Sequence, residues 1–299
     1  MSTRPKLKDS ESTDSALPGL PNQAEEIHAS GPEDRSARDP ILSELKALWT
    51  HRGLLATLTT NDLKYRYMGS SIGFFWTVLN PIVELVTYTF VFHVLMGVQF
   101  SERGGTVHYS LFLFCGMIGW FALAEGCQRA TWSIRENAQL IKKVNFPAAV
   151  LPASVVFSAV INQYIRFGVL AVAIIFLGTG AGAGLSPTVL TLPIFVALQA
   201  IFVLGLSFFL ATAHVYFRDT GHWVNALFLA WMFITPIFYP PHAYPQEFQI
   251  LLQLNPMAHF VGIYQEIMLN ARMPHVRQIL FALLYSTSSL VIGYSVFVN

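Results

Sequence analysis

The sequence of 299 residues is 54% hydrophobic, only 12% charged, and carries a formal net charge of +1. This near-neutral charge gives no reason to expect a nucleic-acid partner. The two cysteines, Cys115 and Cys127, are separated by about 18 Å if they share a helix, which is too far for a disulfide bond, so they are interpreted as packing residues.

Residues 1–40 differ in composition from everything that follows. They hold 13 of the 35 charged side chains and no aromatic residue. Such a segment cannot bury enough apolar surface to fold, and its composition predicts a disordered tail. It also lacks the apolar core of a cleavable signal peptide. From residue 41 onward only 22 charged residues are spread over 259 positions, which predicts an all-α integral membrane protein.

Residues 41–60 form the first predicted helix. Ile41, Leu45, Leu48 and Leu55 recur at helical spacing, and Trp49 is placed to anchor the helix at the membrane interface. An ordinary soluble amphipathic helix is the alternative. A polar hinge at 61–71 then leads directly into the first apolar run, and this favours the membrane interpretation.

Hydrophobic runs predict a permease domain over 61–299 with six spans. They cover about 72–98, 109–132, 149–177, 189–217, 223–239 and 276–298. Between spans two and three, a short amphipathic helix is predicted at 133–146. Between spans five and six, the gate region 242–274 contains apolar pieces too short to cross, which predicts short helices against one membrane face.

The distribution of cations predicts the orientation of the spans. Nine lysines and arginines precede span one or lie around the second and fourth loops, and three lie in the opposite loops. By the positive-inside rule, both termini and the 133–146 helix are expected in the cytoplasm.

Ionisable residues within the spans are costly in hydrocarbon and are therefore expected to face protein or water. Glu84 in span one is either a pore-side residue or a structural hydrogen-bond partner, and the sequence favours neither. Glu125 and Arg129 are four residues apart, which favours a local ion pair over contact with a substrate.

No enzymatic signature occurs in the sequence. It has no glycine-rich phosphate loop and no His-Glu-x-x-His pattern. Asp219 and His222 lie three residues apart beside Arg218, which is more typical of a helix boundary than of an active site. A transport subunit that binds neither a metal nor a cofactor of its own is therefore expected.

Four motifs resemble one family in order and spacing. Asp-Leu-Lys-Tyr-Arg-Tyr at 62–67 is followed by Gly-Ser-Ser-Ile-Gly-Phe-Phe-Trp at 69–76 and Leu-Asn-Pro at 79–81. This run is similar to the start of the membrane subunit of type-2 ABC exporters of polysaccharides, the permeases for O-antigen, capsule and teichoic acid. The segments 137–152, 216–219 and 235–258 resemble this family's coupling helix, the end of its fourth span and its outer gate.

The resemblance implies a homodimer in the bacterial inner membrane that works with two copies of an ATPase, which would hold ATP and magnesium. It implies a lipid-linked or otherwise anchored polysaccharide as the substrate. Two alternatives stay open, namely an exporter of a small lipid or drug, and a membrane-embedded transferase acting on lipid-linked sugars.

The resemblance and the residue types together assign four groups of candidate site residues. Those for docking the ATPase are Ile134, Arg135, Asn137, Leu140, Lys142, Lys143 and Phe146. Those for the cytoplasmic entrance are Lys64, Tyr65, Arg66, Tyr67 and Trp76. Those for the channel interior are Glu84, Tyr88, Trp120 and Arg166, and those for the outer gate are Tyr239, Asn255 and Pro256.

Overall fold

The computed structural model describes residues 50–66, 68–97, 99–102, 105–143, 147–177, 186–240 and 244–298. The chain divides into two units, 1–39 and 40–299, and every described residue belongs to the second. The predicted tail at 1–40 and the first part of the predicted interface helix, with Trp49, lie outside the described residues.

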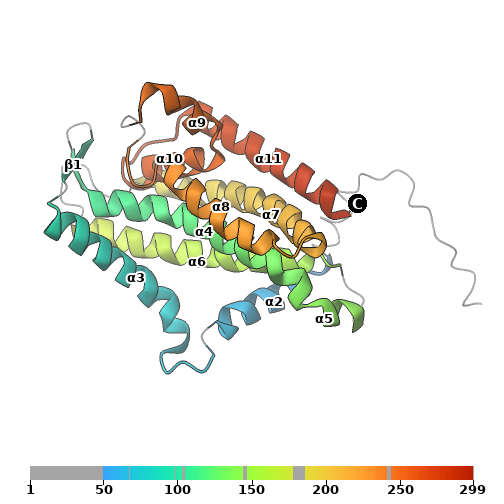
Figure 1. Ribbon diagram of the computed structural model, residues 1–299. Coiled ribbons are helices and arrows are strands. Elements are labelled where there is room, and N and C mark those ends of the chain that lie inside the picture. The colour runs from blue at the N-terminus through green and yellow to red at the C-terminus, as the bar shows by residue number, and fades with distance from the viewer. Residues whose placement is uncertain are drawn as a thin grey trace, which may run out of the picture. The chain divides into compact units, whose positions relative to one another are not determined.

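The described part of the second unit is mostly helical (Figure 1). Its elements, in chain order, are α2 (Arg52–Tyr65), η1 (Gly73–Phe75), α3 (Trp76–Tyr88), the π-helical η2 (Thr89–Leu95), β1 (Gln99–Glu102), β2 (Gly105–His108), α4 (Tyr109–Glu136), α5 (Ala138–Lys143), α6 (Val150–Leu177), η3 (Pro187–Thr191), α7 (Leu192–Tyr216), α8 (Thr220–Ile234), η5 (Gln246–Phe248), α9 (Gln249–Leu254), α10 (Pro256–Met268) and α11 (Val276–Val298). The sequence predicts only a polar loop after span one, whereas β1 and β2 pair as an antiparallel hairpin.

Five helical segments are long and apolar enough to cross a membrane. They are Gly73–Leu95, Tyr109–Glu136, Val150–Phe176, Pro187–Tyr216 and Val276–Val298. They coincide with five of the six predicted ranges. The remaining range, 223–239, is occupied by α8, which has 15 residues and is therefore only about 22 Å long. It ends at Ile234 because Thr235 precedes Pro236, and a residue before proline favours the extended conformation that Thr235 adopts.

The predicted end of the first helix and the predicted start of the short helix after span two are both wrong. Helix α2 continues through Tyr65, so the predicted hinge at 61–71 begins five residues later. The predicted helix at 133–146 is divided, because residues 133–136 form the last turn of α4 and a separate helix begins only at Ala138. Asn137 makes the turn between them, and its side-chain amide donates a hydrogen bond to the carbonyl oxygen of Ser133 at 2.8 Å.

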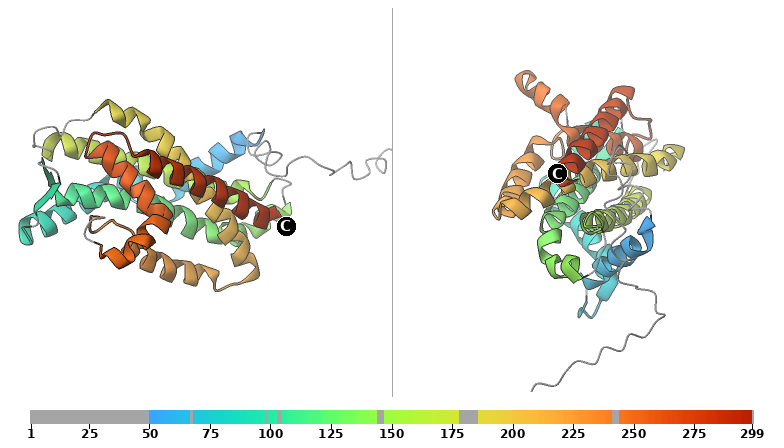
Figure 2. Two further views of the ribbon diagram at one scale, coloured as in Figure 1. Left: turned by 90° about the horizontal axis from the view of Figure 1, so that it is seen from above. Right: turned by 90° about the vertical axis from the view of Figure 1, so that its right-hand side faces the viewer.

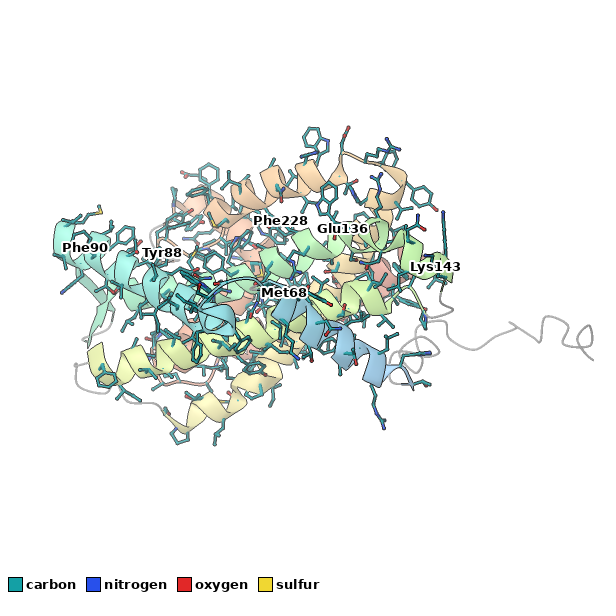
Figure 3. All side chains as sticks on the ribbon, turned by 90° about the horizontal axis from the view of Figure 1, so that it is seen from below. Met68, Tyr88, Phe90, Glu136, Lys143 and Phe228 are labelled. Carbon is teal, nitrogen blue, oxygen red and sulfur yellow. The ribbon has the colours of Figure 1, made fainter. Side chains whose placement is uncertain are left out.

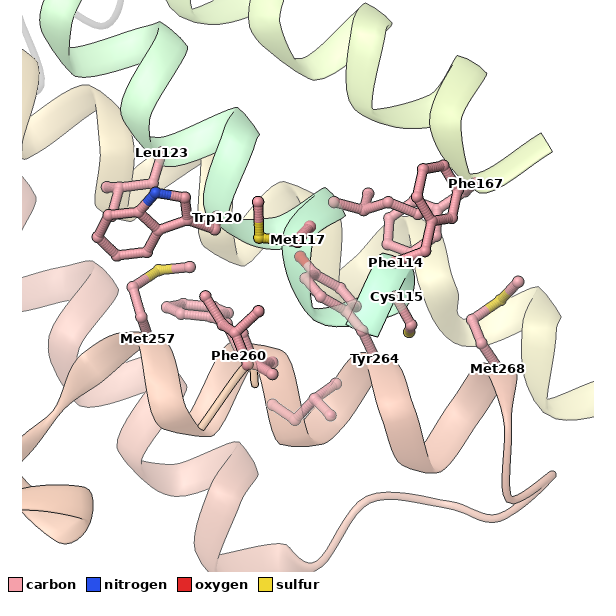
Figure 4. Packing of buried hydrophobic residues seen from close by; sticks show 14 of the residues in the cluster. Phe114, Cys115, Met117, Trp120, Leu123, Phe167, Met257, Phe260, Tyr264 and Met268 are labelled. Carbon is pink, nitrogen blue, oxygen red and sulfur yellow. The ribbon is translucent and has the colours of Figure 1, made fainter. Parts of the chain in front are cut away.

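Helix α4 is the centre of the bundle and contacts α6, α7, α8 and α10 (Figures 1 and 2). Most of its side chains are buried, and they include both cysteines, which are free thiols. Helix α10 lies within the predicted gate region and packs into the core of the bundle. Its side chains Met257, Phe260 and Tyr264 are fully buried against α4 and its neighbours (Figure 4).

A buried polar cluster joins four helices in this core. The Gln199 side-chain oxygen accepts hydrogen bonds from the Gln163 amide at 2.8 Å and from the Tyr264 hydroxyl at 2.5 Å. The Gln199 amide donates to the carbonyl oxygen of Gly119 at 2.7 Å. Because each of these polar groups is bonded, the cluster fixes α4, α6, α7 and α10 in register.

Helices α7 and α11 approach each other closely through small residues. A Cβ atom built on Gly293 would lie 1.8 Å from the carbonyl oxygen of Gly205, so only glycine fits there. The hydroxyls of Ser286 and Ser289 donate to the carbonyl oxygens of Leu198 and Phe202 at 2.7 and 2.8 Å. Small residues and interhelical hydrogen bonds of this kind are typical of helix packing in membranes.

Candidate functional site

Asp62 on α2 binds two arginines. Its carboxylate accepts a hydrogen bond from Arg66, one turn later on α2, at 3.0 Å. It also accepts from both terminal nitrogens of Arg129 on α4, one of them at 2.8 Å. This geometry corrects the predicted Glu125–Arg129 pair, because Arg129 binds Asp62 instead.

Glu125 on α4 continues the line of charges toward α6 and α3. It accepts a hydrogen bond from Arg66 and another from the side-chain amide of Asn162 on α6 at 2.9 Å. The Arg166 guanidinium on α6 lies 3.8 Å from Glu125 and 3.6 Å from Glu84 on α3. It also covers the Phe121 ring, with its central carbon 4.7 Å from the ring centroid.

We call Asp62, Arg66, Glu84, Glu125, Arg129 and Arg166 the charge ladder. Its three arginines and three carboxylates balance one another, and their side chains are between 15% and 38% exposed. Four buried atoms of the ladder and its surroundings, namely Arg66 Nε, Arg166 Nε, Glu84 Oε2 and Asn162 Oδ1, have no hydrogen-bond partner among the described residues. The ladder therefore joins α2, α3, α4 and α6 at an appreciable cost in desolvation.

The pKa of the Asp62 carboxyl is lower than its ordinary value. Burial raises this pKa, but hydrogen bonds from Arg129 and Ser158 and the positive charges of Arg129 and Arg66 lower it by more, from 3.8 to about 2. Asp62 is therefore ionised at neutral pH. Helices α2 and α6 are also joined by a hydrogen bond from the Thr59 hydroxyl to the carbonyl oxygen of Ser154 at 3.3 Å.

The predicted docking residues lie at one end of the bundle, where Figure 3 shows Lys143 and Glu136, while Phe90 lies at the other end. Arg135, Leu140, Lys142 and Lys143 are exposed, and Ile134 and Asn137 are half-buried. Phe146 lies outside the described residues. The exposed members present two lysines and one arginine on a short helix and its preceding turn.

The predicted entrance residues are only partly brought together. Lys64 and Tyr65 are exposed at the end of α2, whereas Arg66 belongs to the charge ladder. Trp76 begins α3, and its indole N–H donates to the Ser70 hydroxyl at 2.9 Å. Tyr67 lies outside the described residues.

The predicted interior residues separate into two environments. Glu84 and Arg166 bind each other, and Tyr88 is half-buried one turn beyond Glu84. Trp120 lies elsewhere, in the core between α4 and α8. It packs edge-to-face on Phe228 and Trp231, with ring centroids 6.0 and 5.7 Å apart, and is 3% exposed.

The predicted gate residues have structural bonds at the far end of α8. Asn255 caps α10 by accepting from the Met257 amide at 3.0 Å, and Pro256 occupies the first position of that helix. Asn255 also accepts from the Trp231 indole at 2.8 Å, which ties α10 to α8.

The Tyr239 and Tyr244 hydroxyls donate to the carbonyl oxygens of Phe233 and Ile234, which the end of α8 leaves unpaired.

Sequence reasoning missed Asp62 and Asn162 as members of this site. The spacing of Asp62 and Arg66, four residues apart on a helix, is a signal that could have indicated the first pair. Nothing in the sequence indicates Asn162, because its partner Glu125 lies 37 residues away and on another helix.

Long apolar helices that bury paired charges and a polar cluster define a multi-pass membrane protein. The chain belongs to the ABC-2 type transporter family, whose sequence pattern matches residues 53–269. It is 34% identical over 232 residues to the O-antigen export system permease protein RfbA of Myxococcus xanthus. The aligned region covers 77% of this chain and 85% of that relative. Two proteins of the same name from Klebsiella pneumoniae are 29% and 31% identical, over 82% and 73% of this chain and 90% and 80% of their own lengths. These similarities give the chain a transport role.

Proposed function

We propose that this chain is the path-forming subunit of an ATP-driven exporter that moves a lipid-linked or otherwise anchored polysaccharide from the cytoplasm across the inner membrane. The family and the relatives named as O-antigen export permeases support this function. The structural observation that supports this function most strongly is the charge ladder. Charged side chains that remain partly exposed within spans are expected to face a protein partner or water rather than lipid.

The ladder extends far enough into the bundle to border a path. Glu84 lies roughly 16 Å from Gly73 along the first span, and the same span leaves most of its large apolar side chains exposed. We propose that a second copy of the chain covers this side of α3, so that Glu84, Tyr88 and Arg166 border the path between two copies. Trp120 stays in the core of each copy.

A sixth crossing is part of the proposal. Helix α8 contains no charged residue, and the segment 235–240 that follows it can add length to a helix of about 22 Å. With α8 as the fifth of six crossings, both termini lie on the cytoplasmic side, in agreement with the positive charges around α2 and α5. The outer gate then includes Tyr239, Asn255 and Pro256.

The ATPase is proposed to be a separate subunit present in two copies, which holds ATP and magnesium. Its docking surface on this chain includes the exposed side chains of Arg135, Leu140, Lys142 and Lys143. Because α5 follows α4 after the single residue Asn137, a displacement of α5 would be transmitted directly to the central helix.

Deletion of the permease in its native cell tests this function. The polysaccharide is expected to disappear from the cell surface and to accumulate in the cytoplasm in its finished, lipid-linked form, and the wild-type chain restores its export. Normal surface polysaccharide without internal accumulation would contradict the proposed substrate, and export of a small lipid or drug would then be tested in its place.

A further inference from the structure

A cavity of about 590 Å³ opens between α2, α4, α6 and α8. It adjoins the end of the bundle where Figure 3 shows Glu136, one of its lining residues. The ion pair between Asp62 and Arg129 forms part of its wall. The cavity therefore lies where α2 meets the central helix, close to the proposed ATPase docking surface.

Four side-chain amides line this cavity, and one of them, that of Asn137, lies in the turn after α4, whereas the other three come from three different helices. These three belong to Asn61 on α2, Gln128 on α4 and Asn225 on α8. None of the three has a side-chain hydrogen bond to another described residue, whereas the amide of the neighbouring Asn137 is bonded within its own turn. Each amide offers two donors and one acceptor, so the cavity presents hydrogen-bonding capacity that the protein does not use.

The charges and rings of the cavity restrict the chemistry of a ligand. Asp62 and Arg129 neutralise each other, and Glu136 adds a carboxylate, so a phosphate or another anion is disfavoured. Trp132 and Tyr65 contribute aromatic rings to the lining. The Trp132 ring packs on His214, with ring centroids 4.3 Å apart, whereas the Tyr65 ring is exposed. Free amides, an aromatic ring and no excess positive charge suit a neutral polyhydroxyl compound, because amides pair with hydroxyl groups and a flat ring packs on the apolar C–H face of a sugar.

We propose that this cavity binds a sugar residue of the transported polysaccharide on the cytoplasmic side. The inference rests on the proposed function and assigns the first sugar contact to Asn61, Gln128 and Asn225, with the exposed ring of Tyr65 as the stacking ring. Because the three amides come from α2, α4 and α8, a bound sugar bridges these helices. The arrangement of hydroxyl groups on the sugar must match the donors and acceptors of the three amides, and this match would select among glycans.

Binding of the delipidated glycan to the full permease–ATPase complex in lipid nanodiscs tests this assignment. The probe is the surface polysaccharide of the native cell, released from its lipid by mild acid, and the readout is saturation transfer from protein to sugar protons in NMR. Gln128→Met and Asn225→Leu preserve approximate side-chain size and remove the amide. Each is expected to weaken binding about fivefold, the effect of one lost hydrogen bond. Gln249→Met is the matched control, because Gln249 is exposed on α9, outside the cavity.

The outcomes separate the cavity from the function. Weaker binding by both cavity variants, with unchanged binding by the control and unchanged ATP hydrolysis, supports the assignment. No saturation transfer to the wild-type complex, or equal binding by all variants, overturns it even where deletion of the permease blocks export. Normal surface glycan in the deletion strain overturns the proposed function instead.

Discussion

The guanidinium of Arg129 on α4 donates to both carboxylate oxygens of Asp62 on α2, a residue 67 positions earlier in the chain. This bidentate pair connects a helix outside the spans to α4, the most buried of the five candidate spans in the described part of the chain. Arg66, which also binds Asp62, forms an ion pair with Glu125. The Arg166 guanidinium in turn lies close to both Glu125 and Glu84. The position of α2 therefore depends on charges that are held within the bundle.

Asp62→Asn is expected to destabilise the protein and to impair export, because Arg66 and Arg129 lose their shared counter-charge. A loss of about 1–3 kcal/mol is expected for a partly buried, charge-assisted contact. Thermal unfolding of the purified protein and surface glycan in complemented cells measure the two effects. Asp219→Asn is the matched control, since Asp219 is exposed at the start of α8, and an equal loss in both variants would contradict the role of the ladder.

The contribution of Asp62 to stability is expected to depend on pH. Its pKa in the folded protein, about 2, lies below the ordinary 3.8, so the stabilisation is complete above about pH 4 and is lost as the pH falls toward 2. The difference in melting temperature between the wild type and Asp62→Asn should therefore shrink over this range. A difference that stays constant from neutral pH to pH 2 would show that the carboxylate charge is not responsible.

Gly293→Leu is expected to separate α7 from α11. A Cβ at this position would meet the carbonyl oxygen of Gly205 at 1.8 Å, and a backbone atom cannot move aside as a flexible side chain can. Destabilisation of at least about 1–3 kcal/mol follows from such overpacking, measurable as a lower melting temperature and reduced membrane yield. Gly168→Leu on α6 is the control, because nothing lies within 4 Å of the position that a Cβ atom would take there, and equal losses at both sites would argue against close packing.

Tyr264→Phe is expected to weaken the polar cluster in the core. The substitution removes the hydroxyl that donates to Gln199 at 2.5 Å and retains the ring that packs on Phe167. Loss of one buried hydrogen bond costs about 1–2 kcal/mol, which thermal unfolding detects. Tyr285→Phe, at a hydroxyl on the exposed side of α11, should have little effect, and an unchanged stability of Tyr264→Phe would contradict the proposed register function of the cluster.

Lys142→Ala combined with Lys143→Ala is expected to reduce export several-fold without unfolding the protein, because both side chains are exposed on α5 and make no ion pair among the described residues. Co-purification of the ATPase and surface glycan are the two measurements. Exposed charge changes elsewhere, such as Arg277→Ala on α11, serve as the control. Full export by the double variant would remove these lysines from the docking surface.

The long helices could be predicted from the sequence because each depends on a local property, an apolar run of sufficient length. Helices α4 and α7 illustrate this, since their ranges agree with the predicted spans to within a few residues. The end of α4 is harder to predict, because residues 133–136 are as compatible with a separate helix as with a further turn of α4. The hydrogen-bonded turn at Asn137 separates α4 from α5 and so fixes the end of α4 at Glu136.

The pairing within the site could not be predicted, because it depends on contacts between distant segments. Glu125 and Arg129 are correctly spaced for a local pair, yet Asp62 competes for Arg129 from another helix and binds it with two hydrogen bonds. Trp120 shows the same limit for aromatic residues, since hydropathy cannot distinguish a ring in the core from one that borders a path. Its packing against Phe228 and Trp231 emerges only from the fold.

ATP-dependent transport into inverted inner-membrane vesicles tests the central claim most directly. Vesicles from cells that contain this permease and its ATPase are supplied with radiolabelled lipid-linked polysaccharide on their outer, cytoplasmic face. The labelled polymer should become protected from an added glycosidase only when ATP is present, and not in vesicles that carry the Lys142/Lys143 double alanine variant. Polymer that stays fully accessible to the glycosidase while the complex hydrolyses ATP would contradict polysaccharide export by this protein.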